Sequence, residues 1–367
     1  MKKCLISALL SMLLFQGAAL ADESRSSVLI ERETGRILYE HNAHEPLPMA
    51  STTKVMTALL ALENCELNEP VTAGKNAFGV PGTSIYLAEG ETLTMEQMLY
   101  GLMLQSGNDA AVAVAEHVAG SVDAFCRMMT ARAEEIGCEN TVFMTPHGLP
   151  NEVHHTTAWD LALIAREAMQ NEDFRRIVST KRMEIPWENH EYNRVLTNKN
   201  KLLSSCEGAT GIKTGYTNKA GRCLVFSAER NGMELIGAVL NCYSWFDQAA
   251  QILDAGFEKY EMVTLLSAGE RVCEVEIIRG TVPHIGVCAR VPLRVPMEKG
   301  KLPRLETDLP PALPSGVRAG DQVGNAMLYD GEELLLTVPL YAMEDAPESD
   351  FRFHIRQVVE RWQAVSP

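Results

Sequence analysis

Residues 48–63 read PMASTTKVMTALLALE, in which a short polar segment leads directly into an apolar one. The apolar residues recur at helical spacing, so we expect a buried helix over about 51–63. Ser51 and Lys54 are three residues apart, which places them on one face of this helix with Cβ atoms about 5–6 Å apart. A lysine accepts a proton from a serine hydroxyl only if burial or nearby positive charge lowers its pKa. The segment therefore predicts a nucleophile, Ser51, and its general base, Lys54.

A second polar motif, Ser106-Gly107-Asn108, interrupts two expected helices at about 94–104 and 108–119. A polar break of this kind can direct side chains into a cleft rather than into the core. Ser106 is then a candidate proton relay between Lys54 and a leaving group, and Asn108 is a candidate for holding a substrate amide. The alternative is a plain turn in which Asn108 and its neighbour only cap the next helix.

A third motif, Lys213-Thr214-Gly215, precedes the expected strands 222–228 and 234–240. Lys213 supplies a positive charge that can recognise a carboxylate and can lower the pKa of Lys54. Thr214 can donate a hydrogen bond to the same carboxylate, and Gly215 lets a substrate lie close to the backbone. In isolation, the motif is more typical of a turn before a strand.

The order of the three motifs carries more information than any one of them, because each short pattern occurs by chance in many chains. S-x-x-K, S-x-N and K-T-G in this order are associated with active-site serine penicillin-binding proteins and β-lactamases. Together they supply a nucleophile, a base, a proton relay and an anion site. Acyl transfer from a peptide that ends in a free carboxylate requires these parts.

The residues around the motifs extend the similarity. The chain resembles the low-molecular-mass D-Ala-D-Ala carboxypeptidases, the penicillin-binding protein 5 and DacF-like group of peptidase family S11. The resemblance covers about residues 25–258 and is carried by the segments 48–57, 105–111, 146–149, 198–203 and 211–217. The β-rich part and the tail that follow resemble the C-terminal half of the same group.

This resemblance implies a reaction and roles for the residues. Ser51 would attack the penultimate D-Ala carbonyl of a peptidoglycan stem pentapeptide, and water would then hydrolyse the acyl-enzyme. The backbone N–H groups of Ser51 and Tyr216 would form the oxyanion hole, which adds Tyr216 to Lys213, Thr214 and Gly215 as substrate-binding residues. β-Lactams such as penicillin would acylate Ser51. No cofactor and no metal is expected.

Two positions depart from the family pattern. Family members often carry a basic residue shortly after the second of the expected strands, whereas residues 241–245 read NCYSW. If that residue normally helps to hold the terminal carboxylate, Lys213 and Thr214 must do more of this here. His154-His155 stands where the family usually has one polar residue, and no third metal ligand is evident.

The resemblance also implies an α+β fold, with a β-lactamase/transpeptidase-like catalytic domain over 22–259. In that domain an antiparallel sheet is flanked by helices and joined by a helical subdomain. Over 260–346, β-rich stretches alternate with Gly and Pro turns, which predicts a small all-β sandwich. The final segment, 347–367, predicts a basic amphipathic helix that associates with a membrane surface. The alternative is a terminal helix packed on the β-rich domain.

The N-terminus predicts export. Residues 1–21 combine two lysines, an apolar stretch and Ala19-Leu20-Ala21, so we expect a signal peptide and a mature chain that begins at Asp22. An uncleaved anchor is the alternative. The protein would be secreted across the cytoplasmic membrane and be peripherally associated with it. The net charge of −15 argues against nucleic acid as a partner.

The nine cysteines give a less specific signal. Cys4 lies in the expected signal peptide, and the others have irregular spacings without a C-x-x-C pair, so zinc and thioredoxin-like sites find no support. Export permits disulfides. We expect mostly free thiols, with disulfides as the open alternative.

Two other functions are alternatives to a carboxypeptidase. A class A β-lactamase needs a glutamate that activates the deacylating water, and Glu167 with Asn171 formally fits its E-x-x-x-N pattern. The pair lies at the end of an expected helix and closer to Lys213 than that class would place it. The second alternative is a catalytically silent penicillin-binding scaffold that binds wall peptide or a partner.

Overall fold

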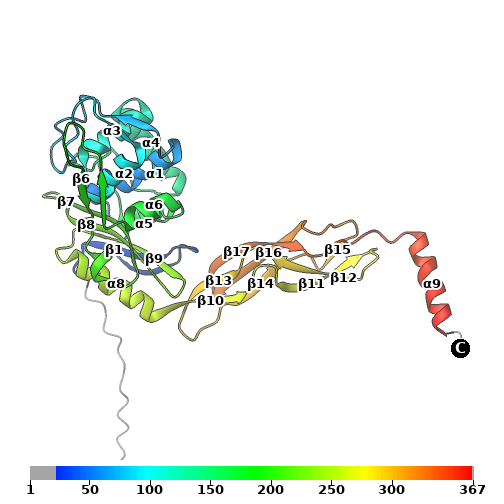
Figure 1. Cartoon of the computed structure of the whole chain (residues 1–367). Coiled ribbons are helices and arrows are strands. Elements are labelled where there is room, and N and C mark those ends of the chain that lie inside the picture. Colours follow the sequence, from blue (N-terminus) through cyan, green and yellow to red (C-terminus); the bar gives the residue numbers. More distant parts are fainter. Residues whose placement is uncertain (1–21, 366–367) are drawn as a thin grey trace, which may run out of the picture.

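The computed structural model describes residues 22–365, so the expected signal peptide lies outside the described residues. Figure 1 shows a mixed helix and sheet body, an elongated β-rich part beside it, and a single helix at the far end. The body contains helices on both sides of an antiparallel sheet together with a group of helices above it. This is the α+β architecture that the sequence predicts.

The central sheet of the body has five antiparallel strands in the order β2-β1-β9-β8-β7. Its strands are β1 (Ser26–Glu31), β2 (Ile37–His41), β7 (Ala209–Thr217), β8 (Gly221–Arg230) and β9 (Met233–Leu240). Alternate residues of β9 enter different cores: Ile236 packs with the helical group, and Leu235 packs on the opposite face. Because side chains alternate along a strand, an apolar strand such as β9 must be covered on both faces.

Helices supply both covers. One face packs against α8 (Trp245–Lys259), and the other against α5 (Ala158–Ala168) and α6 (Glu172–Ser179). The remaining helices are η1 (Ala50–Thr53), α1 (Lys54–Asn64), α2 (Met95–Leu104), α3 (Asn108–Ala119), α4 (Val122–Ile136) and α7 (Leu202–Ser205). Two small hairpins complete the body: β3 (Pro70–Thr72) with β4 (Thr92–Thr94), and β5 (Arg182–Ile185) with β6 (Arg194–Thr197).

The β-rich part follows α8 directly. Its strands are β10 (Tyr260–Leu266), β11 (Arg271–Ile278), β12 (His284–Ala289), β13 (Leu293–Glu298), β14 (Arg304–Asp308), β15 (Ala312–Pro314), β16 (Gln322–Asp330) and β17 (Glu333–Ala342). Six of them form a sheet in the order β14-β16-β17-β12-β11-β15, and β10 pairs with β13. The two sheets enclose one apolar core that includes Val287, Leu328 and Leu340. The predicted all-β sandwich is therefore present.

The last helix, α9 (Phe351–Val365), stands apart from the β-rich part in Figure 1. Phe351, Val358 and Trp362 are 77%, 68% and 79% exposed. The alternative of a helix packed on the β-rich domain therefore does not match the structure. None of the helices within residues 22–365 has the length and apolar character needed to cross a membrane.

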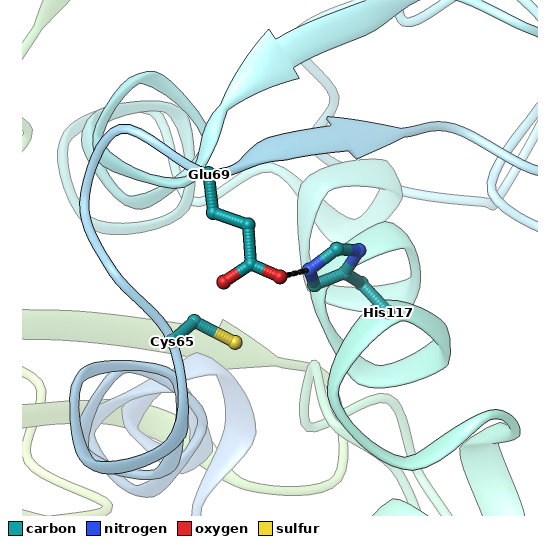
Figure 2. A group of neighbouring side chains, drawn as sticks. All are labelled: Cys65, Glu69 and His117. Carbon is teal, nitrogen blue, oxygen red and sulfur yellow. Dashed lines mark hydrogen bonds and ion pairs between the residues drawn. The ribbon is translucent and has the colours of Figure 1, made fainter.

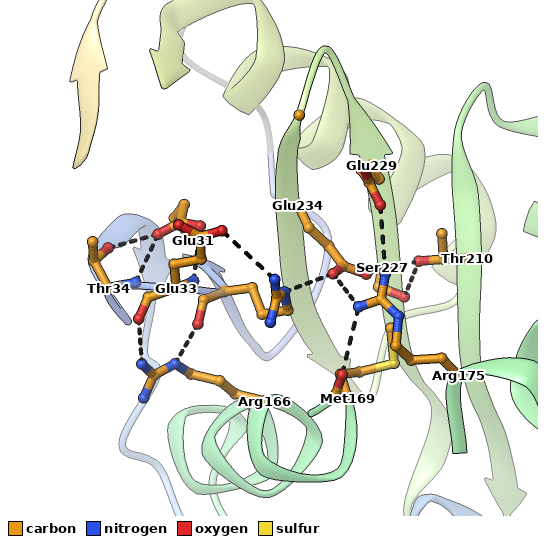
Figure 3. A network of polar contacts seen from close by, with 12 residues as sticks. Glu31, Glu33, Thr34, Arg166, Met169, Arg175, Thr210, Ser227, Glu229 and Glu234 are labelled. Carbon is orange, nitrogen blue, oxygen red and sulfur yellow. Dashed lines mark hydrogen bonds and ion pairs between the residues drawn. The ribbon is translucent and has the colours of Figure 1, made fainter. Parts of the chain in front are cut away.

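Polar contacts tie the body to the β-rich part through the β1–β2 turn. Arg36 donates to the Pro296 carbonyl at 2.7 Å and pairs with Asp330 at 2.6 Å, and Glu33 pairs with Arg294. Figure 3 shows how the same turn is held from behind, where Arg166 donates to the Glu33 carbonyl. On β9, the buried Glu234 pairs with Arg32 and accepts from Arg175 in the same network. The turn is therefore fixed by α5 and the sheet before it reaches the second domain.

Candidate active site

The expected serine–lysine pair lies at the start of α1. Ser51 belongs to the 3₁₀ turn η1, and Lys54 begins α1 and is fully buried. The Lys54 Nζ donates to the Ser51 Oγ at 3.1 Å, to the Asn108 Oδ1 at 2.7 Å and to the His147 carbonyl at 2.8 Å. All three acceptors are neutral, so the amine is buried without a direct carboxylate partner.

The surroundings of Lys54 favour its neutral form. Burial lowers its pKa well below the ordinary value, and the charges of Lys213 and Lys199 lower it further, whereas Asp109 acts in the opposite direction. Lys213 is also buried, and burial together with Lys199 lowers its pKa to about 7. A neutral amine has two N–H donors, which the Asn108 Oδ1 and the His147 carbonyl can accept, so its lone pair is left to accept the proton of the Ser51 hydroxyl. Accepting that proton is what a general base requires.

The S-x-N motif lies between α2 and α3 and faces the same place. Asn108 donates through Nδ2 to the Pro81 carbonyl at 2.6 Å while its Oδ1 accepts from Lys54. The N-cap of α3 is Gly107, and Asn108 makes no capping hydrogen bond, so the alternative in which Asn108 only caps the helix is wrong. Its neighbour Asp109 does accept from the Ala110 N–H at 2.9 Å in the first turn. Ser106 has a positive φ of 64°, and its buried Oγ makes no hydrogen bond with the residues that the structure describes.

The K-T-G motif lies within the edge strand β7, not in a turn before a strand. A Cβ added to Gly215 would lie 2.9 Å from the Ser51 nitrogen and 3.0 Å from the Thr52 nitrogen. Only glycine therefore fits where β7 passes η1. This close approach brings the backbone of Gly215 and Tyr216 next to that of Ser51.

These elements enclose a cavity of about 610 Å³. Six of the expected site residues line it: Ser51, Ser106, Asn108, Thr214, Gly215 and Tyr216. The other two, Lys54 and Lys213, are buried beneath the surface of the cavity. The structure thus brings all eight residues predicted from the three motifs and the resemblance to one place.

The comparisons with known proteins agree with this geometry. The sequence model of the D-alanyl-D-alanine carboxypeptidase family matches residues 15–244. The chain belongs to this family. A second model, described as the penicillin-binding protein 5 C-terminal domain, matches residues 260–348.

Relatives in the carboxypeptidase family match between about two thirds and nearly the whole of the chain. D-alanyl-D-alanine carboxypeptidase DacF of Bacillus subtilis is 32% identical over 94% of this chain and 91% of its own length. Penicillin-binding protein 5 from Haemophilus influenzae superposes with a TM-score of 0.76 and 27% identity, covering 89% of this chain and 98% of its own. A D-alanyl-D-alanine carboxypeptidase from Mycobacterium tuberculosis covers 66% of this chain and 94% of its own, with a TM-score of 0.63 and 32% identity.

Three cationic residues that line the cavity were not predicted as site residues from the sequence, namely Lys199, Lys201 and Arg222. Lys199 lines it, and burial lowers the pKa of this lysine. Arg222 reaches it from β8, where it pairs directly with Tyr216 of β7. It donates to the Tyr243 carbonyl at 2.6 Å, with its guanidinium 4.6 Å from the Tyr243 ring centre. Among the described residues, Arg222 forms no ion pair with a carboxylate.

The extra histidine supports the nucleophile turn from behind. The Met144 N–H donates to the His154 Nδ1 at 3.0 Å, so Nε2 carries the proton and donates to the Thr53 Oγ1 at 2.8 Å. Burial lowers the pKa of His154 to about 4, which keeps this neutral form. His155 is partly exposed, and its Nδ1 contacts the carbonyl of Val153.

The glutamate required by the β-lactamase alternative is engaged elsewhere. Glu167 pairs with Arg132 at 2.6 Å and accepts from Gln170 at 2.8 Å. It is not among the residues that line the Ser51 cavity. Asn171 accepts from backbone N–H groups at the start of α6 and is its N-cap. Both residues therefore have local structural partners.

Proposed function

We propose that this member of the carboxypeptidase family removes the terminal D-Ala from peptidoglycan stem pentapeptides through an acyl-enzyme on Ser51, and that penicillin acylates the same serine. The contact that carries the proposal is the 3.1 Å hydrogen bond between the buried Lys54 Nζ and the Ser51 Oγ. A serine hydroxyl becomes a useful nucleophile only when a neighbouring base takes its proton. The lowered pKa of Lys54 supplies that base.

The proposed reaction begins with attack of the Ser51 Oγ on the penultimate D-Ala carbonyl as Lys54 accepts the hydroxyl proton. The N–H groups of Ser51 and Tyr216 stabilise the oxyanion, and donors of this kind are worth roughly 3–4 kcal/mol each. Ser106 relays a proton to the departing D-Ala nitrogen, while Asn108 holds a substrate amide. Water then cleaves the Ser51 ester and restores the free enzyme.

The substrate carboxylate requires positive charge in the cavity. Lys213 and Thr214 supply part of the anion site, as the motif predicts. We propose that Arg222 supplies the rest, because this residue lines the same cavity and pairs directly with Tyr216. A guanidinium has five N–H donors, and the contact with the Tyr243 carbonyl leaves others for a carboxylate. Arg222 would thus replace the basic residue that segment 241–245 lacks.

We propose a domain division that follows the sequence: catalytic 22–259, β sandwich 260–346 and tail 347–367. The family matches over 15–244 and 260–348 support it. In this proposal the chain is exported by residues 1–21. The exposed apolar side chains of α9 then enter a membrane interface, with Arg352, Arg356 and Arg361 facing anionic headgroups.

Vesicle binding tests the membrane part of the proposal. The chain from Asp22 onward should sediment with vesicles that contain anionic lipid, and a chain that ends at Pro347 should stay in solution. Equal partitioning of the two chains would contradict the role of α9.

D-Ala release tests the enzymatic part. We expect the chain from Asp22 onward to release D-Ala from a pentapeptide that ends in D-Ala-D-Ala, and Ser51→Ala to release none. Ser267→Ala, in the β-rich part, is the matched control and should behave like wild type. Penicillin binding without D-Ala release would favour the scaffold alternative, and faster turnover of nitrocefin than of peptide would favour a β-lactamase.

A further inference from the structure

A second group of reactive side chains lies at the opposite ends of the two helices that carry the catalytic motifs (Figure 2). Cys65 is the C-cap of α1, and His117 lies in the last turn of α3. Glu69 follows the short turn after Cys65 and precedes β3. The Cys65 Sγ, one Glu69 oxygen and one His117 nitrogen all lie within 4.8 Å of one another.

The backbone holds these three residues in place. The Cys65 N–H donates to the Ala61 carbonyl at 3.0 Å, which fixes the end of α1. Glu69 is held on both sides: its N–H donates to the Glu66 carbonyl at 3.0 Å, and its carbonyl accepts from the Met95 N–H at 2.8 Å. Its carboxylate contacts the His117 Nε2 at 2.8 Å. The side chains therefore converge without the need to order a loop.

The combination of a thiol, an imidazole and a carboxylate matches the ligand set of zinc. In a tetrahedral zinc site, ligand atoms lie about 3.3–3.6 Å apart, given bond lengths of about 2.0–2.3 Å. The three atoms need to shift by only about an ångström to reach that spacing. The thiolate and the carboxylate would also neutralise the two charges of the ion. A thiolate ligand disfavours Ca²⁺ and Mg²⁺, which prefer oxygen.

We propose that Cys65, Glu69 and His117 bind one Zn²⁺ or a similar borderline divalent cation, with water as the fourth ligand. On binding, the Cys65 thiol releases its proton to solvent and its sulfur bonds to the metal, with no change of oxidation state. The Glu69 and His117 side chains are 41% and 23% exposed, so the ion can enter from solvent.

The place of the site in the fold indicates what it does. α1 carries Lys54 at its first residue, and at about 1.5 Å per residue its 11 residues span roughly 16 Å. The metal would therefore lie far from Ser51 and take no part in the reaction. It would instead join the C-terminal ends of α1 and α3, whose N-terminal ends present Lys54 and Asn108. The site is a brace for the two helices that position the catalytic motifs.

Cobalt substitution tests the proposal, because a thiolate bound to Co²⁺ gives a charge-transfer absorption that other ligands do not. The probe is Co²⁺, added to the metal-stripped, reduced chain from Asp22 onward and then displaced by Zn²⁺. The variants are Cys65→Ser, Glu69→Gln and His117→Gln. The matched control is Cys273→Ser, because Cys273 is also a half-buried free thiol whose pKa is raised by burial.

We expect one equivalent of Co²⁺, a thiolate band in wild type and in Cys273→Ser, and no band in Cys65→Ser. Affinity should fall at least tenfold in Glu69→Gln and His117→Gln, and Zn²⁺ should raise the melting temperature of wild type but not of these two variants. Absence of the band in wild type, or its persistence in Cys65→Ser, would overturn the site. Penicillin labelling of Ser51 in every variant verifies folding and tests the proposed function separately.

Discussion

The catalytic body and the β-rich part bury different kinds of side chain. Every buried polar or charged side chain within residues 22–365 lies between Ser24 and Gln248. They include two lysines, Lys54 and Lys213, that are almost completely buried. The core of the β-rich part, with Val287 and Leu340 among its members, is formed by apolar residues alone.

This difference indicates where the chemistry lies. Burying an amine costs free energy, and in practice its pKa shifts toward the neutral form. A fold retains such groups where the shifted pKa is useful, as it is beside Ser51. The β-rich part bears no such cost, which fits a domain that supports the catalytic body rather than acting on substrate.

The largest expected effect comes from removing the buried base. Lys54→Gln should slow acylation by penicillin about 10²–10⁴-fold, the range for loss of a general base. Lys301→Gln, at an exposed lysine of the β-rich part, is the control and should leave the rate unchanged. The measurement is the second-order rate of labelling with a fluorescent penicillin. Equal rates in the two variants would end the assignment of Lys54 as the base.

The pH dependence separates the two buried lysines. Lys54 acts when neutral, so acylation should rise with pH as it loses its proton. Lys213 acts when charged, so with its pKa at about 7 the rate for a carboxylate substrate should fall above that pH. The fall should approach about tenfold per pH unit. A β-lactam methyl ester lacks the carboxylate and should show no fall; identical profiles would contradict the role of Lys213.

A smaller effect is expected from replacing Arg222, which lines the cavity. Arg222→Gln should raise KM for a D-Ala-D-Ala peptide about five- to tenfold. This factor is smaller than the loss of a buried charged hydrogen bond would give, because solvent weakens the contact between Arg222 and the carboxylate. Arg290 is a close match in the β-rich part, because it also lies over a tyrosine ring and donates to a backbone carbonyl. Arg290→Gln should leave KM unchanged. A change in kcat alone for Arg222→Gln would contradict carboxylate binding.

The smallest effect on activity should follow the loss of packing in the β-rich part. Leu340 is completely buried, so Leu340→Ala should destabilise this domain by about 2–5 kcal/mol. Acylation of Ser51 should change by less than about twofold, because the catalytic body has its own core. Calorimetry with parallel penicillin labelling measures both. A large loss of labelling at a temperature where the body remains folded would show that the two regions are coupled.

Much of the site follows from local sequence, because helical spacing alone brings Ser51 and Lys54 together. The place of Lys213-Thr214-Gly215 in the fold is harder to predict from the sequence. Its strand, β7, lies at the sheet edge and lacks the alternation of apolar and polar residues that indicates a strand, so the local sequence favours a turn. The position of Arg222 at the cavity cannot be predicted from local sequence, because it depends on the strand register that places Arg222 opposite Tyr216. The contact of Lys54 with the His147 carbonyl likewise joins residues 93 positions apart.

The strand order of the β-rich part also cannot be predicted from local sequence. The Gly and Pro turns and the apolar stretches predict a sandwich, but they do not fix the order of its strands. β15 pairs in parallel with β11 at the edge of the larger sheet, and β10 pairs with β13 outside it. Such pairings depend on long-range packing, which local patterns do not encode.

Mass spectrometry of the penicillin-treated chain tests the role of Ser51 most directly. The account predicts one penicillin adduct per chain, located by peptide mapping on the segment that contains Ser51 and lost in Ser51→Ala. An adduct on another residue, such as Ser106, or no adduct on a folded chain would contradict it.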